Sequence, residues 1–332
     1  MIKRIAAVVI AALLSAACLT GCGTGKQPAA EKLRVCEVTH SVFYAPQYVA
    51  MALGFFEQQG LEIELTCGEG ADKVMAAVLS GGADIGFAGP EAAVYVYRQG
   101  KQDYAQVFAQ VTKRDGSFLI ARQPAEDFSW QQLRGQTVLP GRKGGVPYMT
   151  LEYVLRQNGL DPAQDVVLDN SIQFSLMTAA FVNGTGAYVT AFEPTASTLV
   201  RNGQGYIVAS VGAAAGEIPY TAYFAPKSFL EQHADAVLRF TKAIRQGEQW
   251  VQQHSAAEIA QAIAPSFADT DLSLLTAALQ SYKDIDAWCS EPVMQQQAFD
   301  RLQTVMQQAG ELEQPVPFDQ VVNNTFALQA AG

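Results

Sequence analysis

The sequence is poor in charge, and basic residues are the scarcer sign. Charged residues make up 16% of the 332 positions, and 22 Lys and Arg stand against 32 Asp and Glu, so the net charge is −10 at pH 7. A nucleic-acid-binding protein needs a basic footprint, which this composition does not provide. With 49% apolar residues the chain is too hydrophobic to be disordered, and its length exceeds what one hydrophobic core usually organises. We therefore expect a globular protein of two lobes that binds no nucleic acid.

Motifs for catalysis, nucleotide binding and metal binding are also missing. The sequence has no Gly-x-Ser-x-Gly, no His-Glu-x-x-His and no phosphate-binding loop, and no Cys/His spacing suits zinc. No long apolar run occurs after the N-terminus, so the chain is not itself a permease. We expect no enzymatic activity, no cofactor and no metal site.

The N-terminus carries the signals of export. Lys3 and Arg4 precede an apolar run over 5–17, which is shorter than a membrane-spanning helix, and Leu19-Thr20-Gly21-Cys22 resembles the lipobox of bacterial lipoproteins. This pattern predicts a signal peptide over 1–21, a lipid on the Cys22 thiol and a flexible tether over 22–32. An uncleaved anchor, or an ordinary signal peptide with a chance cysteine, stays open. The expected location is the extracytoplasmic face of the cell membrane, either on a Gram-positive surface or in a periplasm.

Three cysteines remain after the predicted lipidation site. Cys36 and Cys67 lie on predicted neighbouring strands, and Cys289 lies in the tail. The first two are compatible either with a disulfide or with two free thiols, and the sequence leaves both alternatives open.

Strands and helices alternate through most of the chain. Strands are predicted over 33–39, 61–66 and 83–87, with helices over 47–56 and 71–79 between them. The rhythm restarts with strands over 136–139, 186–192 and 206–210. This alternation is typical of α/β proteins with parallel sheets whose faces are covered. From Lys227 onward the pattern is almost wholly helical.

The order of these units predicts an inserted lobe. We assign 33–115 and 220–332 to a first lobe and 116–219 to a second lobe, with crossings near Gly116 and Tyr220. Two crossing segments between lobes form a natural hinge.

Several ordered motifs resemble a known family, the substrate-binding proteins of ABC importers in the nitrate, sulfonate and thiamine-precursor group. The motifs are Ser41-Val-Phe-Tyr-Ala-Pro-Gln-Tyr-Val-Ala50, Gly54-Phe-Phe-Glu-Gln-Gln-Gly-Leu-Glu-Ile63, Ser80-Gly-Gly-Ala-Asp-Ile-Gly86 and Phe192-Glu-Pro194. The resemblance implies the type II periplasmic-binding-protein fold, an α/β fold of two lobes with the ligand held between them. It also implies a permease and an ATPase as separate chains. We expect a monomer.

Five loops are candidates for ligand contact, because ligands of open α/β sheets bind where strands enter helices. Three lie on the first lobe and two on the second, so that a ligand would be gripped from both sides. The candidate residues are Ser41, Phe43, Tyr44, Gly70, Ala71, Gly89, Glu91, Arg142, Gly144, Gly145, Phe192 and Glu193. For each one an ordinary structural role is the alternative: a turn, a packing residue or a solvated charge, and for Glu193 a charge that stabilises the N-terminus of its own helix.

Two ligand classes fit these residues. Aromatic side chains with the Glu193 carboxylate favour a planar nitrogenous compound such as a thiamine-precursor pyrimidine. Arg142 together with amides at helix N-termini favours a sulfonate, taurine, nitrate or similar anion. A sensor lipoprotein or an adhesin subunit could share the fold. A related enzyme family that makes the thiamine pyrimidine uses a cysteine-rich motif, which this sequence lacks. The sequence determines neither the ligand nor its affinity.

Overall fold

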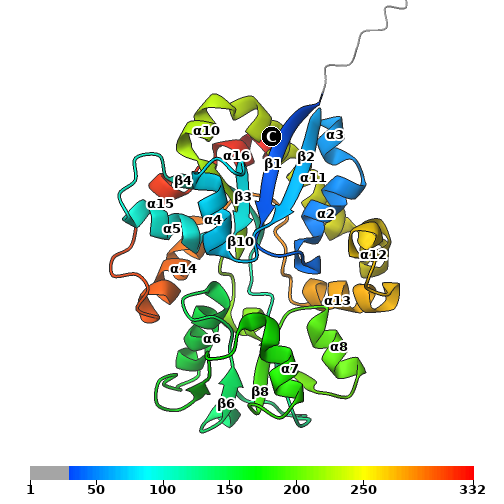
Figure 1. Cartoon of the computed structure of the whole chain (residues 1–332), viewed down its shortest axis with the longest axis vertical. Helices are drawn as coiled ribbons and strands as arrows, with labels where there is room; N and C mark the ends of the chain where they lie inside the picture. The colour runs from blue at the N-terminus through cyan, green and yellow to red at the C-terminus, as the bar shows by residue number, and fades with distance from the viewer. Residues whose placement is uncertain (1–29) are drawn as a thin grey trace, which may run out of the picture. The chain divides into compact units, whose positions relative to one another are not determined.

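The computed structural model describes residues 30–332, of which Glu31–Gly332 form one compact unit. The predicted signal peptide, Cys22 and most of the predicted tether lie outside the described residues. Figure 1 shows two α/β lobes, one above the other, each built on its own sheet.

The first lobe is built on a five-stranded sheet in the order β2-β1-β3-β10-β4. Its strands are β1 (Glu31–Glu37), β2 (Leu61–Cys67), β3 (Ile85–Ala88), β4 (Ala105–Thr112) and β10 (Thr221–Pro226). β1 pairs in parallel with β2, from Glu31 opposite Leu61 to Glu37 opposite Cys67, and with β3 on its other side. β3 and β4 are buried along their whole length. β3 is wholly apolar, as a covered strand usually is, whereas β4 also buries Gln106, Gln110 and Thr112.

The second lobe has a sheet in the order β7-β6-β8-β5-β9. Its strands are β5 (Phe118–Ala121), β6 (Thr137–Leu139), β7 (Val167–Leu168), β8 (Tyr188–Ala191) and β9 (Tyr206–Ser210). β6 is parallel to both of its neighbours, whereas β5 is antiparallel to β8 and β9.

The expectation of parallel sheets is therefore wrong for one strand of each sheet. β10 runs antiparallel to β3 and β4 because it brings the chain back from the second lobe and so enters the first sheet from the opposite end. The alternation of strands and helices does not reveal this, because the returning strand follows no crossover helix of the first lobe.

The chain passes between the two sheets twice. β4 ends at Thr112 in the first sheet and β5 begins at Phe118 in the second, while β9 ends at Ser210 and β10 begins at Thr221. Both intervals contain one of the predicted crossing points, Gly116 and Tyr220. The exact lobe boundaries stay a prediction.

The predicted helix over 47–56 is divided in two, α2 (Ala45–Ala52) and α3 (Phe55–Gln58). Gly54 separates them with φ +70°, a left-handed conformation that favours glycine. α4 (Ala71–Leu79) has the predicted bounds. The remaining α-helices are α5 (Glu91–Arg98), α6 (Val146–Gln157), α7 (Met177–Val182), α8 (Thr195–Arg201), α9 (Val211–Ala215), α10 (Lys227–Gln232), α11 (Ala234–Gln253), α12 (Ala256–Ile263), α13 (Leu272–Asp284), α14 (Gln296–Gln308), α15 (Phe318–Val321) and α16 (Thr325–Ala331). Short 3₁₀ turns lie at 42–44, 130–133, 174–176 and 264–267.

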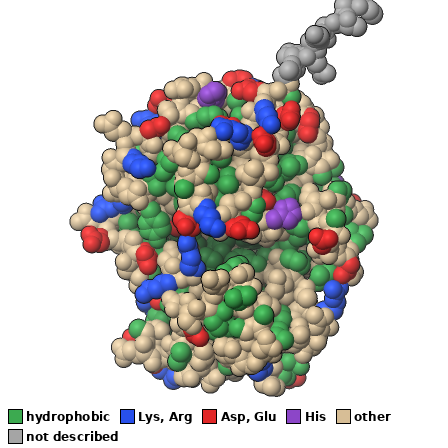
Figure 2. Space-filling model, viewed as in Figure 1, with side chains coloured by type: hydrophobic (Ala, Val, Ile, Leu, Met, Phe, Trp, Pro, Cys, Tyr) green, Lys and Arg blue, Asp and Glu red, His purple; other side chains and the backbone are tan. Residues whose placement is uncertain are grey.

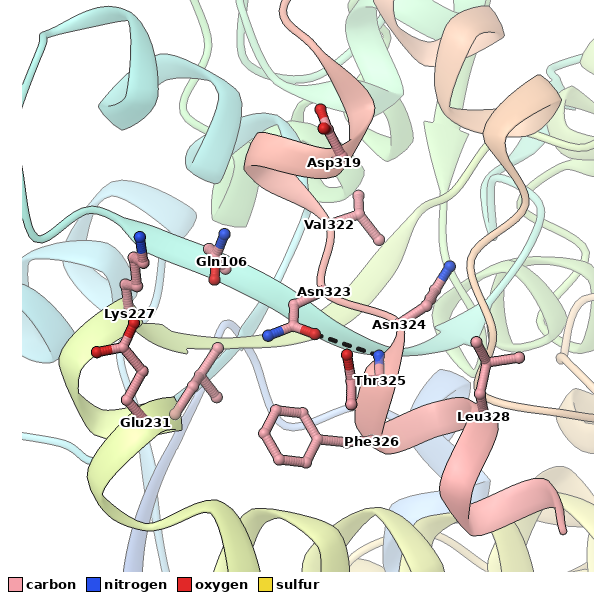
Figure 3. A pocket seen from close by; sticks show the side chains of 11 residues that line it. Gln106, Lys227, Glu231, Asp319, Val322, Asn323, Asn324, Thr325, Phe326 and Leu328 are labelled. Carbon is pink, nitrogen blue, oxygen red and sulfur yellow. Dashed lines mark hydrogen bonds between the residues drawn. The ribbon is translucent and has the colours of Figure 1, made fainter.

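The C-terminal tail covers the edge of the first sheet. Val322 bridges to Val107 of β4, and the Asn323 amide donates to the Val107 carbonyl at 2.7 Å. Beside this contact lies an open recess of about 530 Å³, shown in Figure 3. Its polar groups are engaged locally, since Asn323 accepts from the Thr325 amide and Gln106 donates to the Gln320 carbonyl. The recess is formed where the C-terminal tail packs over β4, the edge strand of the first sheet.

Candidate functional site

Phe43 is the centre of an aromatic cluster between the lobes. Its ring centroid lies 4.7 Å from that of Tyr282 and 5.5 Å from that of Tyr220, with the rings of Tyr44 and Phe192 at 5.9 and 6.3 Å. Phe192 belongs to the second lobe, so this cluster, which we call the aromatic floor, joins both lobes. Figure 2 shows apolar side chains lining a hollow where the lobes meet.

The loop that carries Phe43 is fixed from both ends. Ser41 caps the 3₁₀ turn by accepting from the Phe43 amide at 3.2 Å, and the Trp288 indole donates to the Phe43 carbonyl at 2.7 Å. A Cβ on Gly116 would lie 2.8 Å from the Phe43 ring, so the first crossing segment passes directly against the floor. Phe43 and Tyr44 are buried, which agrees with a packing role as well as with one wall of a binding site.

A buried carboxylate is hydrogen-bonded to residues on both sides of this loop. Glu37, at the end of β1, accepts from the Tyr48 hydroxyl at 2.7 and 2.8 Å and from Gln47 Nε2 at 2.9 Å. His40 lies 3.2 Å from the same carboxylate, with its other ring nitrogen 2.7 Å from the Ser266 carbonyl oxygen. Burial raises the pKa of Glu37, while the hydrogen bonds from Tyr48 and His40 oppose the rise. All these groups satisfy one another, so the network has a structural role.

Glu91, a predicted site residue, is buried at the first position of α5 and is only 5% exposed. Its side chain turns back over Gly89: a Cβ there would lie 1.9 Å from Glu91 Oε2. Among the described residues Oε2 has no hydrogen-bond partner. Burial raises the pKa of Glu91 to about 7, although its own amide, that of Ala92 and the charge of Arg142 oppose the rise.

A second carboxylate of this kind is Asp115 on the first crossing segment, which the sequence did not single out. It is 1% exposed, and Oδ1 accepts from the Ser117 amide at 2.7 Å and from the Ser117 hydroxyl at 2.5 Å. Oδ2 has no partner in the described part of the chain. Burial raises the pKa of Asp115 to about 6, against the hydrogen bonds from Ser117.

The N-terminus of α4 already has an anionic neighbour. Gly70 caps the helix with φ +151° and donates to the Val38 carbonyl, and the Asp72 carboxylate folds back to 2.8 Å from where a Cβ on Gly70 would stand. Arg142 of the second lobe forms an ion pair with Asp72 at 3.2 Å, and both side chains are largely exposed. Arg142 is therefore a rim residue with its charge balanced by Asp72.

The N-terminus of α6 is similar. Gly144, with φ +78°, and Gly145 form the predicted turn, and the Glu311 carboxylate oxygens lie 3.4–3.6 Å from where a Cβ on Gly144 would stand. Tyr95 of α5 donates to the Gly144 carbonyl at 3.4 Å, which links the two lobes.

Glu193 caps its own helix. Both of its oxygens accept from Ser197, one from the amide at 2.9 Å and one from the hydroxyl at 2.8 Å, and its own amide donates to the Tyr282 hydroxyl at 3.0 Å. The residue is 2% exposed. The structure therefore gives this carboxylate the helix-capping role that was its alternative, and the contact with a ligand stays a prediction.

Taken together, each of the four helix N-termini at the predicted loops lies against a carboxylate. They are α4 with Asp72, α5 with Glu91, α6 with Glu311 and α8 with Glu193. A helix N-terminus attracts anions, but here that attraction is already satisfied by the protein itself. Of these carboxylates, only Glu91 keeps a buried oxygen without a partner.

Three further observations concern cysteines, metal ions and membrane spans. Cys36 and Cys67 are free thiols, and the parallel register places Cys36 opposite Thr66, so that Cys36 and Cys67 point to opposite faces of the sheet. Across residues 30–332, no group of three or more His, Cys, Asp or Glu side chains suits a metal ion. No helix in that range is long and apolar enough to cross a membrane.

The residues that sequence reasoning missed come from the crossing segments and the tail. Asp115, Tyr220, Tyr282 and Glu311 reach the site only because distant parts of the chain fold onto it. Asp115-Gly116 had one visible signal, a turn dipeptide placed at a predicted crossing.

The architecture is that of the two-lobed periplasmic binding proteins. The alkanesulfonate-binding protein SsuA from Xanthomonas axonopodis pv. citri, bound to MOPS, superposes with a TM-score of 0.71 at 16% identity, over 91% of this chain and 100% of that one. The nitrate-binding protein NrtA from Synechocystis PCC 6803 superposes with a TM-score of 0.70 at 16% identity, over 92% and 89%. At these identities the likeness defines the fold, which confirms the predicted fold class.

The sequence comparison is more specific. Residues 27–264 match the NMT1-like family. "Putative binding protein YtlA" of Bacillus subtilis (strain 168) is 44% identical over 296 residues, which cover 89% of each chain. The chain belongs to the NMT1-like family, and the predicted relationship to ABC-importer substrate-binding proteins is confirmed.

Proposed function

We propose that this protein is the extracytoplasmic solute-binding component of an ABC importer and delivers a small ligand to a permease and ATPase encoded as separate chains. Membership of the NMT1-like family, the name of the Bacillus subtilis relative and the two-lobed fold support this role. The names of these proteins describe binding, which favours a non-enzymatic role here as well.

The ligand that the site supports best is a planar nitrogenous heterocycle, such as a thiamine-precursor pyrimidine. The observation that carries this choice is the aromatic floor around Phe43, combined with carboxylates at the helix N-termini of the surrounding loops. Aromatic rings stack on a planar ligand, and carboxylates accept hydrogen bonds from ring or exocyclic N–H groups.

A sulfonate or nitrate-type anion is the second candidate. Arg142 at the rim and the titles of the fold neighbours favour it. The Asp72 partner of Arg142 and the carboxylate at each helix N-terminus oppose it, because an anion would lie close to several fixed negative charges.

A thermal-shift panel tests both classes on the purified protein. It includes aminopyrimidines, riboflavin, amino acids, alkanesulfonates and nitrate, and a ligand at 100 times its Kd adds about 2.7 kcal/mol to the free energy of unfolding. We expect stabilisation by planar nitrogenous compounds only. Stabilisation by alkanesulfonates or nitrate would establish the second candidate, and a response to no member of the panel would contradict the transport role as stated.

The proposed anchor is the lipid on Cys22, for which the lipobox-like Leu19-Thr20-Gly21-Cys22 is the support. Cys22→Ala should leave an unlipidated chain, either as a membrane-bound precursor or released after aberrant processing. Fractionation with metabolic lipid labelling checks this, with the unmodified chain as control. A mutant that is still labelled and processed like the control would refute the anchor.

A further inference from the structure

We propose that the ligand is an organic cation whose positive N–H groups are bound by two carboxylates, Glu91 from the first lobe and Asp115 from the first crossing segment. This inference rests on the proposed function and narrows its ligand class. It depends on two buried carboxylates from separate parts of the chain, each with an oxygen that has no hydrogen-bond partner among the described residues.

Both carboxylates are buried and incompletely hydrogen-bonded. Each is at least 95% buried, and each has one buried oxygen without a hydrogen-bond partner among residues 30–332. The other oxygen of Asp115 accepts from the Ser117 amide and hydroxyl. A buried polar atom normally has a partner, and leaving one unsatisfied is costly. Two such oxygens in one site indicate that their partners come from a molecule that binds there.

The strand register brings both groups close to Tyr220, a ring of the aromatic floor. Tyr220 directly precedes β10, in which Ala222 pairs with Ala88 at the end of β3, three residues before Glu91. Its amide donates to the Thr112 carbonyl at 3.1 Å, three residues before Asp115. In agreement, the negative charges of Asp115 and Glu91 both raise the pKa of the Tyr220 hydroxyl. Glu91 also raises the pKa of Tyr44, another ring of the floor. Asp115 also directly precedes Gly116, whose Cβ position is 2.8 Å from the Phe43 ring, so both carboxylates come from segments that adjoin the aromatic floor.

The charge of the ligand follows from what surrounds the pair. Arg142 is the cation that acts on Glu91, and it is already paired with Asp72 at the exposed rim. Beside Asp115 in the chain, the cations Lys113 and Arg114 are paired with Glu217 and Asp286, and Arg114 Nε has no hydrogen-bond partner among the described residues. A ligand with a delocalised positive charge and N–H groups on a flat frame would supply the missing donors and the missing charge, as an amidinium or a protonated aminoheterocycle does.

A matched set of probes isolates charge from shape. Benzamidinium, benzamide and benzoate have nearly the same flat outline and carry charges of +1, 0 and −1. Their affinities for the full purified protein can be measured by calorimetry, together with those for Glu91→Gln and Asp115→Asn. The control is Glu248→Gln, since Glu248 is also fully buried with unpartnered oxygens but lies on α11, away from the aromatic floor.

We expect benzamidinium to bind about 10- to 100-fold more tightly than benzamide, and benzoate to bind most weakly. Glu91→Gln and Asp115→Asn should each reduce the preference for benzamidinium over benzamide, whereas Glu248→Gln should leave it unchanged. The ratio of two affinities within one variant does not depend on how much that variant is destabilised.

Equal binding of benzamidinium and benzamide would overturn the cation inference and leave the planar-ligand function intact. Tightest binding of benzoate would overturn both the inference and the choice of ligand class. A preference for the cation that survives in both Glu91→Gln and Asp115→Asn would overturn the assignment to these two residues. No binding of any probe would contradict the planar-ligand function itself.

Discussion

Glu91→Gln should stabilise the ligand-free protein, and only at neutral to alkaline pH. Burial raises the pKa of Glu91 from 4.5 to about 7, so its ionisation is less favourable in the folded state than in the unfolded chain. A carboxyl group whose pKa is higher in the folded than in the unfolded state does not change the free energy of unfolding at a pH below its unfolded pKa. As the pH rises from the unfolded pKa to the folded pKa, the group destabilises the folded state by an increasing amount.

The magnitude follows from that shift. A difference of about 2.5 pKa units corresponds to about 3 kcal/mol, fully developed above pH 7 and almost absent at pH 4. For a protein of this size the same free energy corresponds to a change in melting temperature of roughly 5 °C. Glu91 interacts electrostatically with Arg142, Tyr44, Tyr95 and Tyr220, and of these four groups only Arg142 carries a charge between pH 4 and pH 8.

Urea unfolding of the wild type and Glu91→Gln at pH 4 and pH 8 measures the effect. At each pH the free energy of unfolding of the wild type is subtracted from that of the mutant, and the two differences are then compared. Any pH-independent effect of the amide on stability cancels in this comparison. Glu126→Gln is the control, since Glu126 is exposed. A mutant-minus-wild-type difference that is the same at both pH values would refute the reasoning about Glu91.

Three other variants probe the site. Gly89→Ala places a Cβ 1.9 Å from Glu91 Oε2 and must displace that carboxylate. It should therefore weaken benzamidinium binding about as much as Glu91→Gln does. Wild-type affinity in calorimetry would contradict this prediction. Arg142→Ala removes an exposed ion pair with Asp72 worth about 0–1 kcal/mol, so the Kd for a cationic or neutral ligand should change by less than about 5-fold; a larger loss of affinity would make Arg142 a ligand contact. Glu193→Gln should change ligand affinity less than about 3-fold, because both Glu193 oxygens accept hydrogen bonds from Ser197. It should lower the free energy of unfolding by at most about 1 kcal/mol. An affinity that falls about 10-fold would instead support the ligand contact predicted from the sequence.

The fold could be predicted largely from local pattern. α4 and β9 have the predicted bounds, and both predicted crossings lie in the intervals between the two sheets, because alternating strands and helices are encoded by neighbouring residues. The division of one helix at Gly54 and the antiparallel direction of β10 were missed. The first depends on one backbone angle, and the second on where the chain returns from the second lobe.

Residues of the site could be predicted from the sequence only in loops that come directly after a strand. The loops with Phe43, Glu91 and Arg142 were found because each comes directly after a predicted strand, or opens the helix that follows one. Asp115 and Glu311 could not be found in this way, since one lies between the lobes and the other belongs to the tail. Nor could the sequence show that Glu193 turns toward Ser197 rather than into the site, because both orientations suit the first turn of a helix.

The carboxylates at the helix N-termini have a consequence for competition in the surroundings of the cell. Sulfate, phosphate and nitrate are abundant solutes, and a helix N-terminus without an acidic neighbour is a common place for them to bind. Asp72, Glu311 and Glu193 place a carboxylate at three of these positions, so inorganic anions gain little by binding there. The organic cation proposed above would then compete little with the inorganic anions around it.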